Sequence, residues 1–538
     1  MASVSNACYC SGKGPEGAAR RHRNKALPVL PLVDERKEIM SIYEYICDHL
    51  TPSGTLPADF KLPGRTPVEV SSSHSALSDM QLVDGALDGI ALFHGPSEEA
   101  DCTPLADLLS STSMGDTESI QAAIEAYFAP STGHRMLPLE APLLQWTSDH
   151  TEEVAADELF ATAANLLVTT ESCECVKLAL VLFSMLDTDD NDAVKDAVRI
   201  LALSDEFTLF AIHVAESWQD AEEEILRFGQ QVHGWGRIHA VEHLEAKSGR
   251  VKDWLFHAGV HNTIGAAYSA RTVADKIHLA IVLTNPAFND EDFVLASAIL
   301  DGLLDESSMQ GITAMPDRTQ LLDAYLHQAR RCRMSEQTLN TVLNVRDYLD
   351  QNIFQGSGKL HERAEEILHT DDIQSFVQEL LAKGQGFRTA CRMGIQCTDE
   401  MLHAIDTQFD VYADLVDALP KDSDTLKKLL DIYRRHLPLV MMASGPRDQL
   451  GIGEAYRPYH QLSYLVQNLA DSTGEGEDLV ISSLRCPVNA NRQMALNVLE
   501  SWCKDGYEPG DAMRAALQEL LAVEPCDDIR AQLEALKY

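Results

Sequence analysis

The sequence predicts an all-α protein built of stacked helical hairpins. From about residue 117 to the C-terminus, segments of about 10 to 15 residues carry apolar side chains three or four positions apart. Short breaks containing Asp, Asn, Ser or Gly separate these segments. The spacing is that of amphipathic helices, and short helices joined by short turns over hundreds of residues are typical of helical-repeat arrays.

One pattern occurs twice in the chain. Arg-x-x-Ala-Val-x-x-Leu-Glu at residues 237–245 recurs at residues 492–500 with Leu in place of Val, and a weaker copy begins at Ala197. The small alanine would let a neighbouring helix approach closely, and the apolar residues after it would form a packing stripe. Because this resembles the second helix of a HEAT-type repeat, we predict a HEAT/ARM-like α-solenoid. The alternative is an irregular multi-domain helical protein without true repeats.

The N-terminal part of the chain differs from the rest in its charge. Residues 1–39 hold seven Lys and Arg against four Asp and Glu, and we interpret them as a disordered tail or an upstream extension, with Met40 a possible natural start. Ser41 and Glu44 predict a capping box for a first helix.

The apolar run GIALFH, flanked by glycines, is the best strand candidate. The expected organisation is a small mixed region at 40–116, a helical-repeat segment at 117–285, a helical segment at 286–443, a loop at 444–458 and a C-terminal helical-repeat segment at 459–538.

Composition and charge exclude several classes of protein. The 538 residues are 45% hydrophobic, which is too much for a disordered chain. The net charge of −40 argues against nucleic-acid binding, and an extended acidic surface would attract a protein partner with a basic surface. No apolar run approaches the roughly 20 residues that span a bilayer. Twelve scattered cysteines favour a reducing, cytoplasmic location.

The segments at residues 234–246 and 252–270 resemble a family of bacterial HEAT/ARM-repeat-like helical proteins, as do MSIYEYI from Met40 and DGALDGIALFH from Asp84. The resemblance covers most of residues 40–270. The matching positions include Trp235, Gly236, Arg237, His239, Glu242, Trp254, Asn262 and Tyr268.

Some members of that family carry the label limonene hydroxylase, which implies a monooxygenase using haem, flavin or iron. The sequence holds no dinucleotide-binding glycine fingerprint, haem-thiolate loop or two-His-one-carboxylate motif. The resemblance therefore implies the fold more than the activity, and we expect no cofactor.

His239 and His243 are the candidate metal ligands. They lie four residues apart with Glu242 between them, so on one helix both imidazoles point the same way and could hold a divalent ion. The order H-A-V-E-H differs from the H-E-x-x-H of zinc proteases, so Glu242 is not placed as their general base. The favoured interpretation is a pair of solvated or hydrogen-bonded histidines on a repeat helix.

Trp235 and Arg237 are the candidate anchors for a partner, since Trp and Arg are enriched at binding hot spots. The favoured interpretation is that Trp235 packs between repeats and that Arg237 ties adjacent hairpins together through hydrogen bonds. The full set of candidate binding residues is Trp235, Arg237, His239, Glu242, His243, Trp254 and Asn262.

We therefore expect a non-catalytic scaffold or adaptor that binds protein through a helical-repeat surface, by analogy of fold. The alternative is an enzyme or small-molecule binder with a pocket between helices, in which His239 and His243 would bind a metal ion. Polar groups from distant helices that converge in an apolar cavity would favour this alternative.

Overall fold

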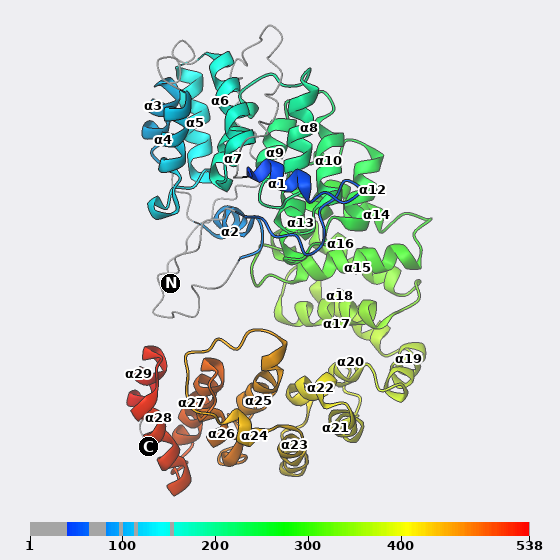
Figure 1. Ribbon diagram of the computed structural model, residues 1–538. Helices are drawn as coiled ribbons and strands as arrows, with labels where there is room; N and C mark the ends of the chain where they lie inside the picture. The colour runs from blue at the N-terminus through cyan, green and yellow to red at the C-terminus, as the bar shows by residue number, and fades with distance from the viewer. Residues whose placement is uncertain (1–39, 64–81, 96–99, 112–116, 151–154, 537–538) are drawn as a thin grey trace. The chain divides into compact units, whose positions relative to one another are not determined.

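The computed structural model describes residues 40–63, 82–95, 100–111, 117–150 and 155–536. Within these ranges every regular element is a helix, and the extended residues are single bridge positions such as Gln449 and Val488, so the prediction of an all-α protein is confirmed. The helices form two compact units: unit 1 holds the described residues up to Ala324, and unit 2 holds those from Tyr325 (Figure 1). No helix in the described ranges is both long and apolar enough to cross a bilayer.

The helices of unit 1 are α1 (Ile42–Asp48), α2 (Ala86–His94), α3 (Thr103–Ser110), α4 (Thr117–Tyr127), η3 (Pro130–Thr132), α5 (Leu137–Asp149), α6 (Ala156–Thr169), α7 (Cys173–Ser184), α8 (Asp192–Leu201), α9 (Thr208–Ala215), α10 (Ala221–Gln231), α11 (Trp235–His243), α12 (Gly249–Ala258), α13 (Ala267–Ile277), α14 (Leu279–Val282), α15 (Asp290–Leu304) and η4 (Ile312–Ala314). Helix α16 (Arg318–Ala329) spans the boundary between the units.

The helices of unit 2 are α17 (Glu336–Gln351), α18 (Ser357–Leu368), α19 (Asp371–Ala382), α20 (Phe387–Arg392), α21 (Thr398–Thr407), α22 (Phe409–Tyr412), η5 (Ala413–Ala418), α23 (Ser423–His436), α24 (Leu439–Met442), η6 (Glu454–Tyr456), α25 (Arg457–Gln467), α26 (Glu477–Leu484), α27 (Asn489–Lys504), α28 (Asp511–Val523) and α29 (Asp527–Ala535).

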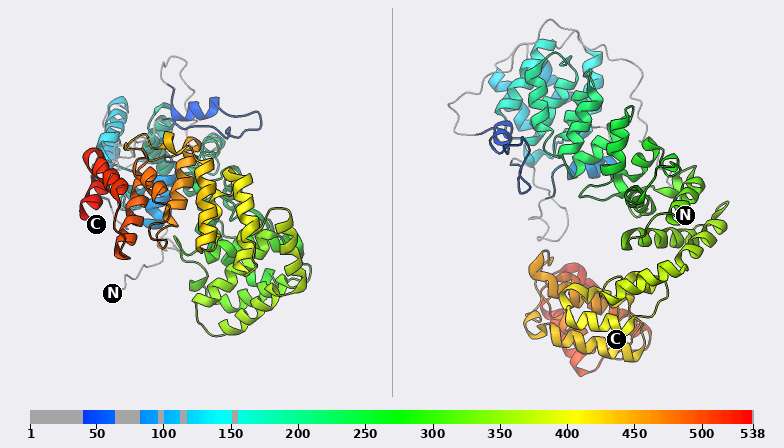
Figure 2. Two further views of the ribbon diagram at one scale, coloured as in Figure 1. Left: turned by 90° about the horizontal axis from the view of Figure 1, so that it is seen from below. Right: turned by 90° about the vertical axis from the view of Figure 1, so that its right-hand side faces the viewer.

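Alternate helices of unit 1 pack against one another in sequence order. Helix α7 packs on α9, α9 on α11, α11 on α13 and α13 on α15, while α6, α8, α10 and α12 pack against members of this row. We call α7, α9, α11, α13 and α15 the odd row. Unit 2 repeats the arrangement, with α25 on α27 and α27 on α29, and with α26 on α28. Figure 2 shows helices that are close in sequence following one another in each unit. The boundary expected near residue 285 falls between α14 and α15, within unit 1.

The first helix begins as its sequence predicts. The backbone N–H of Glu44 donates to Ser41 Oγ at 3.2 Å, and the backbone N–H of Ser41 donates to Glu44 Oε2 at 3.0 Å. These two bonds form the predicted capping box, which satisfies donors that the first turn of a helix leaves free. Ile42 and Ile46 are then buried, and α1 packs on α6 and α8.

The strand prediction for GIALFH is wrong, because these residues belong to helix α2. A lone strand leaves its backbone groups unpaired, whereas a helix satisfies them within the segment. Helix α2 buries only Ala86, Asp88 and Gly89, at helical spacing, and leaves Ile90 and Leu92 about half exposed. In the described residues of the expected mixed region at 40–116, the regular elements are therefore helices joined by turns and loops, and the predictions made for residues 1–39 lie outside the described ranges.

Glycine at position 89 lets α2 lie directly on Trp235 of α11. A Cβ atom at this position would stand 2.2 Å from Trp235 Cε3, far inside van der Waals contact. We expect Gly89→Ala to lower the free energy of unfolding of unit 1 by about 1–3 kcal/mol, since the indole cannot move aside. Hydrogen–deuterium exchange of α2 and the tryptophan fluorescence spectrum measure the effect.

Gly358→Ala is the matched control for this substitution. Gly358 also lies in a helix, α18, but has open space where its Cβ would be. Alanine there is expected to leave stability unchanged or to raise it by up to about 1 kcal/mol. Equal responses of the two variants would contradict the close contact between α2 and Trp235.

Candidate functional site

A buried group of charged side chains fixes helix α2 to the odd row. Lys177 of α7 is fully buried, and its Nζ lies 2.6 Å from Asp88 Oδ2, 2.6 Å from Glu206 Oε1 and 3.1 Å from Glu174 Oε1. Arg135 adds a second cation, 3.2 Å from Glu174 and 3.4 Å from Asp88. We call these five residues the lysine cluster. Its three carboxylates exceed its two cations by one charge.

The lysine cluster shifts the pKa values of Lys177 and Asp88. Burial lowers the pKa of Lys177, but Asp88, Glu174 and Glu206 together raise it above its usual range, so the ammonium stays charged. Burial also raises the pKa of Asp88, and the neighbouring carboxylates add to this rise against the opposing effect of Lys177. A buried lysine held in its charged form in this way is a strong structural constraint on α2.

An aromatic group continues the contact between α2 and the odd row. The ring of Phe93 on α2 lies 5.8 Å from the Trp235 ring and 5.5 Å from the Tyr268 ring, between centroids. His94 Nε2 is 2.8 Å from the Tyr268 hydroxyl. Trp235 is buried and packs against Gly89 and Phe93 of α2, while its packing between repeats stays a prediction.

Three histidines on α9 and α11 lie near two glutamates, Glu140 of α5 and Glu216 at the end of α9. His213 Nδ1 is 2.6 Å from Glu140 Oε1, and His243 Nδ1 is 2.7 Å from Glu216 Oε1. The centroids of the two imidazole rings are 5.2 Å apart. The His239 ring instead stacks near Trp235 and Phe93, with both centroids at 6.4 Å. The structure therefore brings His243 next to His213, a residue that the sequence did not single out.

The two histidines on α11 have different environments. His239 is buried, and burial, with His243 and His213 adding to the effect, lowers its pKa to about 3. The side chains of His213 and His243 are about one quarter exposed. Burial lowers the pKa of His213, but Glu140 and Glu216 raise it by more. His239 is thus a neutral buried ring, while the other two can meet solvent.

These histidines are not grouped as a complete metal centre. In the described part of the chain, no three His, Cys, Asp or Glu side chains are placed to hold one metal ion together. The residues present therefore do not fit the two-His-one-carboxylate iron site that the hydroxylase label of the resembling family would suggest. They do form two histidine–carboxylate pairs, in which the carboxylate fixes the ring and leaves Nε2 as the second ring nitrogen.

Arg237 is a structural residue. Its Nε donates to the carbonyl oxygens of Gly229 and Val232 at 3.1 and 2.8 Å, and its Nη1 donates to His261 O at 2.6 Å. The buried guanidinium thus ties the turn before α11 to the loop after α12. The favoured interpretation of Arg237 as a tie between hairpins is confirmed.

The other candidate residues also make internal contacts. Asn262 Oδ1 accepts hydrogen bonds from the backbone N–H groups of Ile264 and Gly265 at 3.0 and 2.7 Å. Glu242 Oε1 accepts one from Thr272 Oγ1 at 2.5 Å. The half-buried Trp254 lies over Gly229, where an added Cβ would come within 2.9 Å of the indole. These contacts stabilise the α11–α13 region.

The sequence analysis did not identify Lys177 as a candidate residue, because it lies within an apolar run, CVKLALVLFSML, that predicts only a buried helix. A single lysine in a helix buried on all sides must find counter-charges, so its presence there was the available signal. Glu174 lies three residues before Lys177, but Glu206 and Asp88 lie 29 and 89 residues away, and no local pattern connects them to it.

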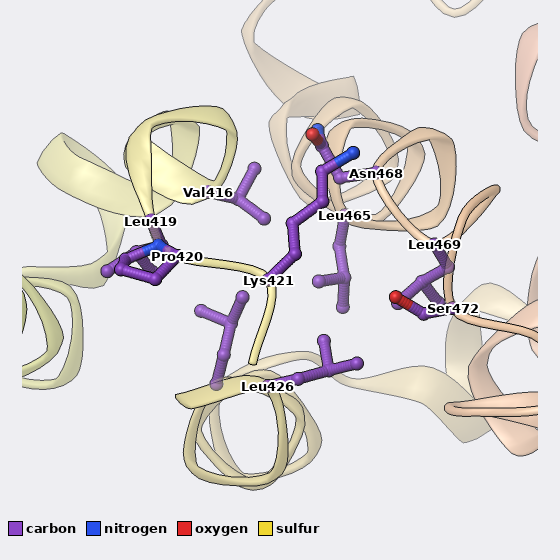
Figure 3. A pocket seen from close by; sticks show the side chains of 10 residues that line it. Val416, Leu419, Pro420, Lys421, Leu426, Leu465, Asn468, Leu469 and Ser472 are labelled. Carbon is purple, nitrogen blue, oxygen red and sulfur yellow. The ribbon is translucent and has the colours of Figure 1, made fainter. Parts of the chain in front are cut away.

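Neither of two hollows in unit 2 involves the candidate residues. A cavity of about 20 Å³ between η5, α23 and α25, lined by residues such as Val416, Leu426 and Leu465, has room for about one water molecule (Figure 3). A hollow of about 350 Å³ lies by α26 and α28, where Arg485 and Glu519 pair with each other at 2.7 Å. All seven candidate binding residues belong to unit 1.

The low pKa of His239 predicts how stability depends on pH. In the unfolded state the His239 imidazole has a pKa near 6.5, whereas in the folded state its pKa is about 3. As the pH falls below 6.5, the unfolded state therefore binds a proton at this residue and the folded state does not, which favours unfolding. We expect this residue to destabilise the fold by about 1 kcal/mol between pH 7 and pH 5.5.

Urea unfolding of the wild type, of His239→Phe and of the exposed control His257→Phe at both pH values measures this contribution. His239→Phe should lose less stability on acidification than the wild type, and His257→Phe should behave as the wild type does. Identical losses for all three proteins would disprove a neutral, buried His239.

Comparison of the chain with protein-family models, curated proteins and solved structures gives no match.

Proposed function

We propose that the protein is a non-catalytic scaffold or adaptor that binds another protein through a HEAT/ARM-like helical-repeat surface. The observation that carries the proposal is the odd row, in which five helices from alternate sequence positions pack side by side. Helices α7, α9 and α11 of this row are almost wholly buried, so the row forms a rigid framework, and the surface that binds the partner consists of the exposed positions of α13, α15 and the loops next to the row. The resemblance of residues 40–270 to HEAT/ARM-like proteins supports the same function.

The equivalent roles of two arginines support a repeated unit. Arg237 in α11 and Arg492 in α27 are both buried, and each donates to a carbonyl oxygen five residues earlier, Val232 O at 2.8 Å and Pro487 O at 3.0 Å. Ala240 and Ala495, three residues after each arginine, are fully buried where a neighbouring helix packs. The same sequence pattern thus makes the same local contacts in both units.

The partner that we propose has a basic surface and shares a reducing cytoplasm with this protein. The net charge of −40 supports this choice, and exposed carboxylates occur on the odd row, including Glu245 after α11 and Asp275 on α13. Long-range attraction between such surfaces speeds association and weakens with salt.

The test is capture of partners by the full chain, followed by cross-linking and mass spectrometry. We expect cross-links on the odd row and a partner that is released as the salt concentration rises. The double variant Glu245→Gln/Asp275→Asn should hold the partner several-fold more weakly. The matched control, Glu223→Gln/Asp253→Asn, changes two exposed, ion-paired acids on α10 and α12 and should bind as the wild type does. Equal retention by both variants would contradict binding through the odd row.

A second candidate function is metal-dependent binding or catalysis at His213 and His243. Two imidazoles that bind one tetrahedral ion through Nε2, with metal–nitrogen bonds of about 2.0–2.1 Å, have ring centroids about 5 Å apart. The observed separation is 5.2 Å, and Glu140 and Glu216 hold the Nδ1 atoms as carboxylates do behind metal-bound histidines. Water or a bound molecule would complete the coordination.

Titration of the full chain with Co²⁺ and Zn²⁺ tests this second function. We expect His213→Asn and His243→Asn each to weaken binding at least tenfold, and Glu140→Gln to weaken it about tenfold. His257→Asn, on the exposed face of α12, is the control. If all variants bind alike, the histidine pair is not a metal site and the scaffold proposal is unaffected.

A further inference from the structure

Two cysteines in unit 2 are brought together by a tight turn. Helix α20 ends at Arg392, and the backbone N–H of Ile395 donates to Ala390 O at 2.9 Å while Gly394 N–H donates to Cys391 O at 2.9 Å. Gly394 has a φ of +72°, the left-handed conformation that closes helix ends of this kind. The chain therefore reverses within a few residues, and Cys397, the residue before α21, returns to the side of Cys391.

The sulfur atoms of this pair are in contact. Cys391 Sγ lies 3.8 Å from Cys397 Sγ and 3.6 Å from Met401 Sδ. A disulfide requires a sulfur–sulfur distance of about 2.05 Å, so the two thiols need to approach by about 1.8 Å, which side-chain rotation and a small shift of the turn supply. Because the turn is closed by a glycine and carries no other packed element between the two cysteines, it is the part that can adjust.

The two thiols differ in their access to solvent. Cys391 is half-buried, whereas Cys397 is only 3% exposed. Burial, with the neighbouring Cys391 thiol adding to the effect, raises the pKa of Cys397 to about 12. Cys397 is thus a protonated thiol that dissolved reagents cannot reach directly, and Cys391 is the sulfur that they meet.

We propose that Cys391 and Cys397 are a redox-responsive dithiol that closes to a reversible disulfide by exchange with a small disulfide such as oxidised glutathione. The Cys391 thiolate attacks one sulfur of the reagent, forms a mixed disulfide and releases one glutathione thiolate. The Cys397 sulfur then attacks Cys391 Sγ, the second glutathione leaves, and the Cys397 proton ends on that glutathione. One disulfide is reduced to two thiols while the protein dithiol loses two protons and two electrons, so the exchange balances.

Closure would join the end of α20 to the start of α21. Helix α20 is held to α17 by Arg392, whose Nη2 lies 2.7 Å from Asp347 Oδ2, and to the η5 segment by Arg388, whose Nη1 lies 2.7 Å from Asp417 Oδ1. The new bond would therefore connect two helices that already have fixed neighbours. Oxidation would therefore make this part of unit 2 more rigid. This effect is separate from the binding surface proposed for unit 1.

Peptide mapping of the full chain tests the proposal directly, because tryptic cleavage occurs between the two cysteines. Cleavage after Arg388, Arg392 and Lys421 places Cys391 in the peptide 389–392 and Cys397 in the peptide 393–421, each as its single cysteine. After treatment with a glutathione redox buffer and trapping with N-ethylmaleimide, we expect the two peptides to remain joined, and dithiothreitol to separate them.

Three variants make the outcome specific. Cys397→Ser should accumulate glutathione on Cys391, and Cys391→Ser should leave Cys397 as a free thiol. Cys503→Ser, which removes another half-buried cysteine, should leave the link unaffected. The proposal is overturned if oxidised wild-type protein carries glutathione on Cys391 with Cys397 still free. It is equally overturned if the purified protein holds one equivalent of zinc or copper that is lost in both Cys391→Ser and Cys397→Ser.

Discussion

Replacing Lys177 with methionine is expected to lower the free energy of unfolding of unit 1 by about 3–5 kcal/mol at pH 7. The substitution leaves Asp88, Glu174 and Glu206 close together in a buried position, with Arg135 as the remaining cation. Their mutual repulsion would weaken the contact between α2 and α7. Hydrogen–deuterium exchange of peptides from α2, α7 and α9 in the intact chain measures the loss, which should be largest in α2.

The pH dependence of this variant identifies the cause of the loss. Burial and the neighbouring carboxylates already raise the pKa of Asp88, and losing the opposing effect of Lys177 raises it further, so the unfavourable effect of the Asp88 charge is absent at low pH and grows as the pH rises. The deficit should therefore shrink between pH 7 and pH 5. Lys428→Met removes an exposed lysine that pairs with Asp424 at 2.7 Å, and should cost less than about 1 kcal/mol. A Lys177→Met deficit that is equally small, or independent of pH, would contradict a buried lysine cluster.

Features with a local cause could be predicted from the sequence. The capping box of Ser41 and Glu44 depends on residues three apart, and it forms as predicted. The hydrogen bonds from Arg237 to the turn before α11 likewise reach only five to eight residues back along the chain. In each case the residues that decide the structure are neighbours in sequence.

Helix α2 shows where a local pattern is insufficient. GIALFH is short, apolar and flanked by glycines, which fits a strand as well as a helix. Tertiary contacts with the odd row favour the helix. Gly89 leaves room for the Trp235 ring, and Asp88, the residue before it, forms an ion pair with Lys177. Those partners lie 89 residues or more along the chain, so the sequence of the segment itself does not contain the information.

The histidines show a related limit. Spacing of four residues on α11 places His239 and His243 on one side of the helix, but it does not decide where each ring points. The His239 ring turns to the aromatic group around Trp235, and the His243 ring meets Glu216 and His213. The partner of His243 comes from another helix of the odd row, which only the packing of α9 on α11 could identify.

Replacing Arg492 with methionine is expected to destabilise the α27–α29 region of unit 2 by about 3–5 kcal/mol. Arg492 and Glu524 are both fully buried and form two parallel bonds of 2.7 Å, from Nε to Oε2 and from Nη2 to Oε1. Removing the cation leaves a buried carboxylate without its counter-charge. Hydrogen–deuterium exchange of α27, α28 and α29 measures the effect. Arg485→Met, whose partner Glu519 is exposed, should cost less than about 1 kcal/mol.

Two further variants separate the cost of the unpaired charge from the cost of the lost carbonyl contacts. Arg492→Met/Glu524→Leu removes both charges and should recover a large part of the stability, because no buried ion is left alone. Arg237→Met, at the equivalent position of unit 1, removes an arginine that donates to carbonyl oxygens and to His233 but binds no carboxylate. Its cost should be about 1–3 kcal/mol, the penalty for unsatisfied buried acceptors. If Arg237→Met and Arg492→Met cost the same, and Glu524→Leu recovers nothing, then the shared arginine stabilises the repeat through its carbonyl contacts alone and the ion pair with Glu524 contributes nothing.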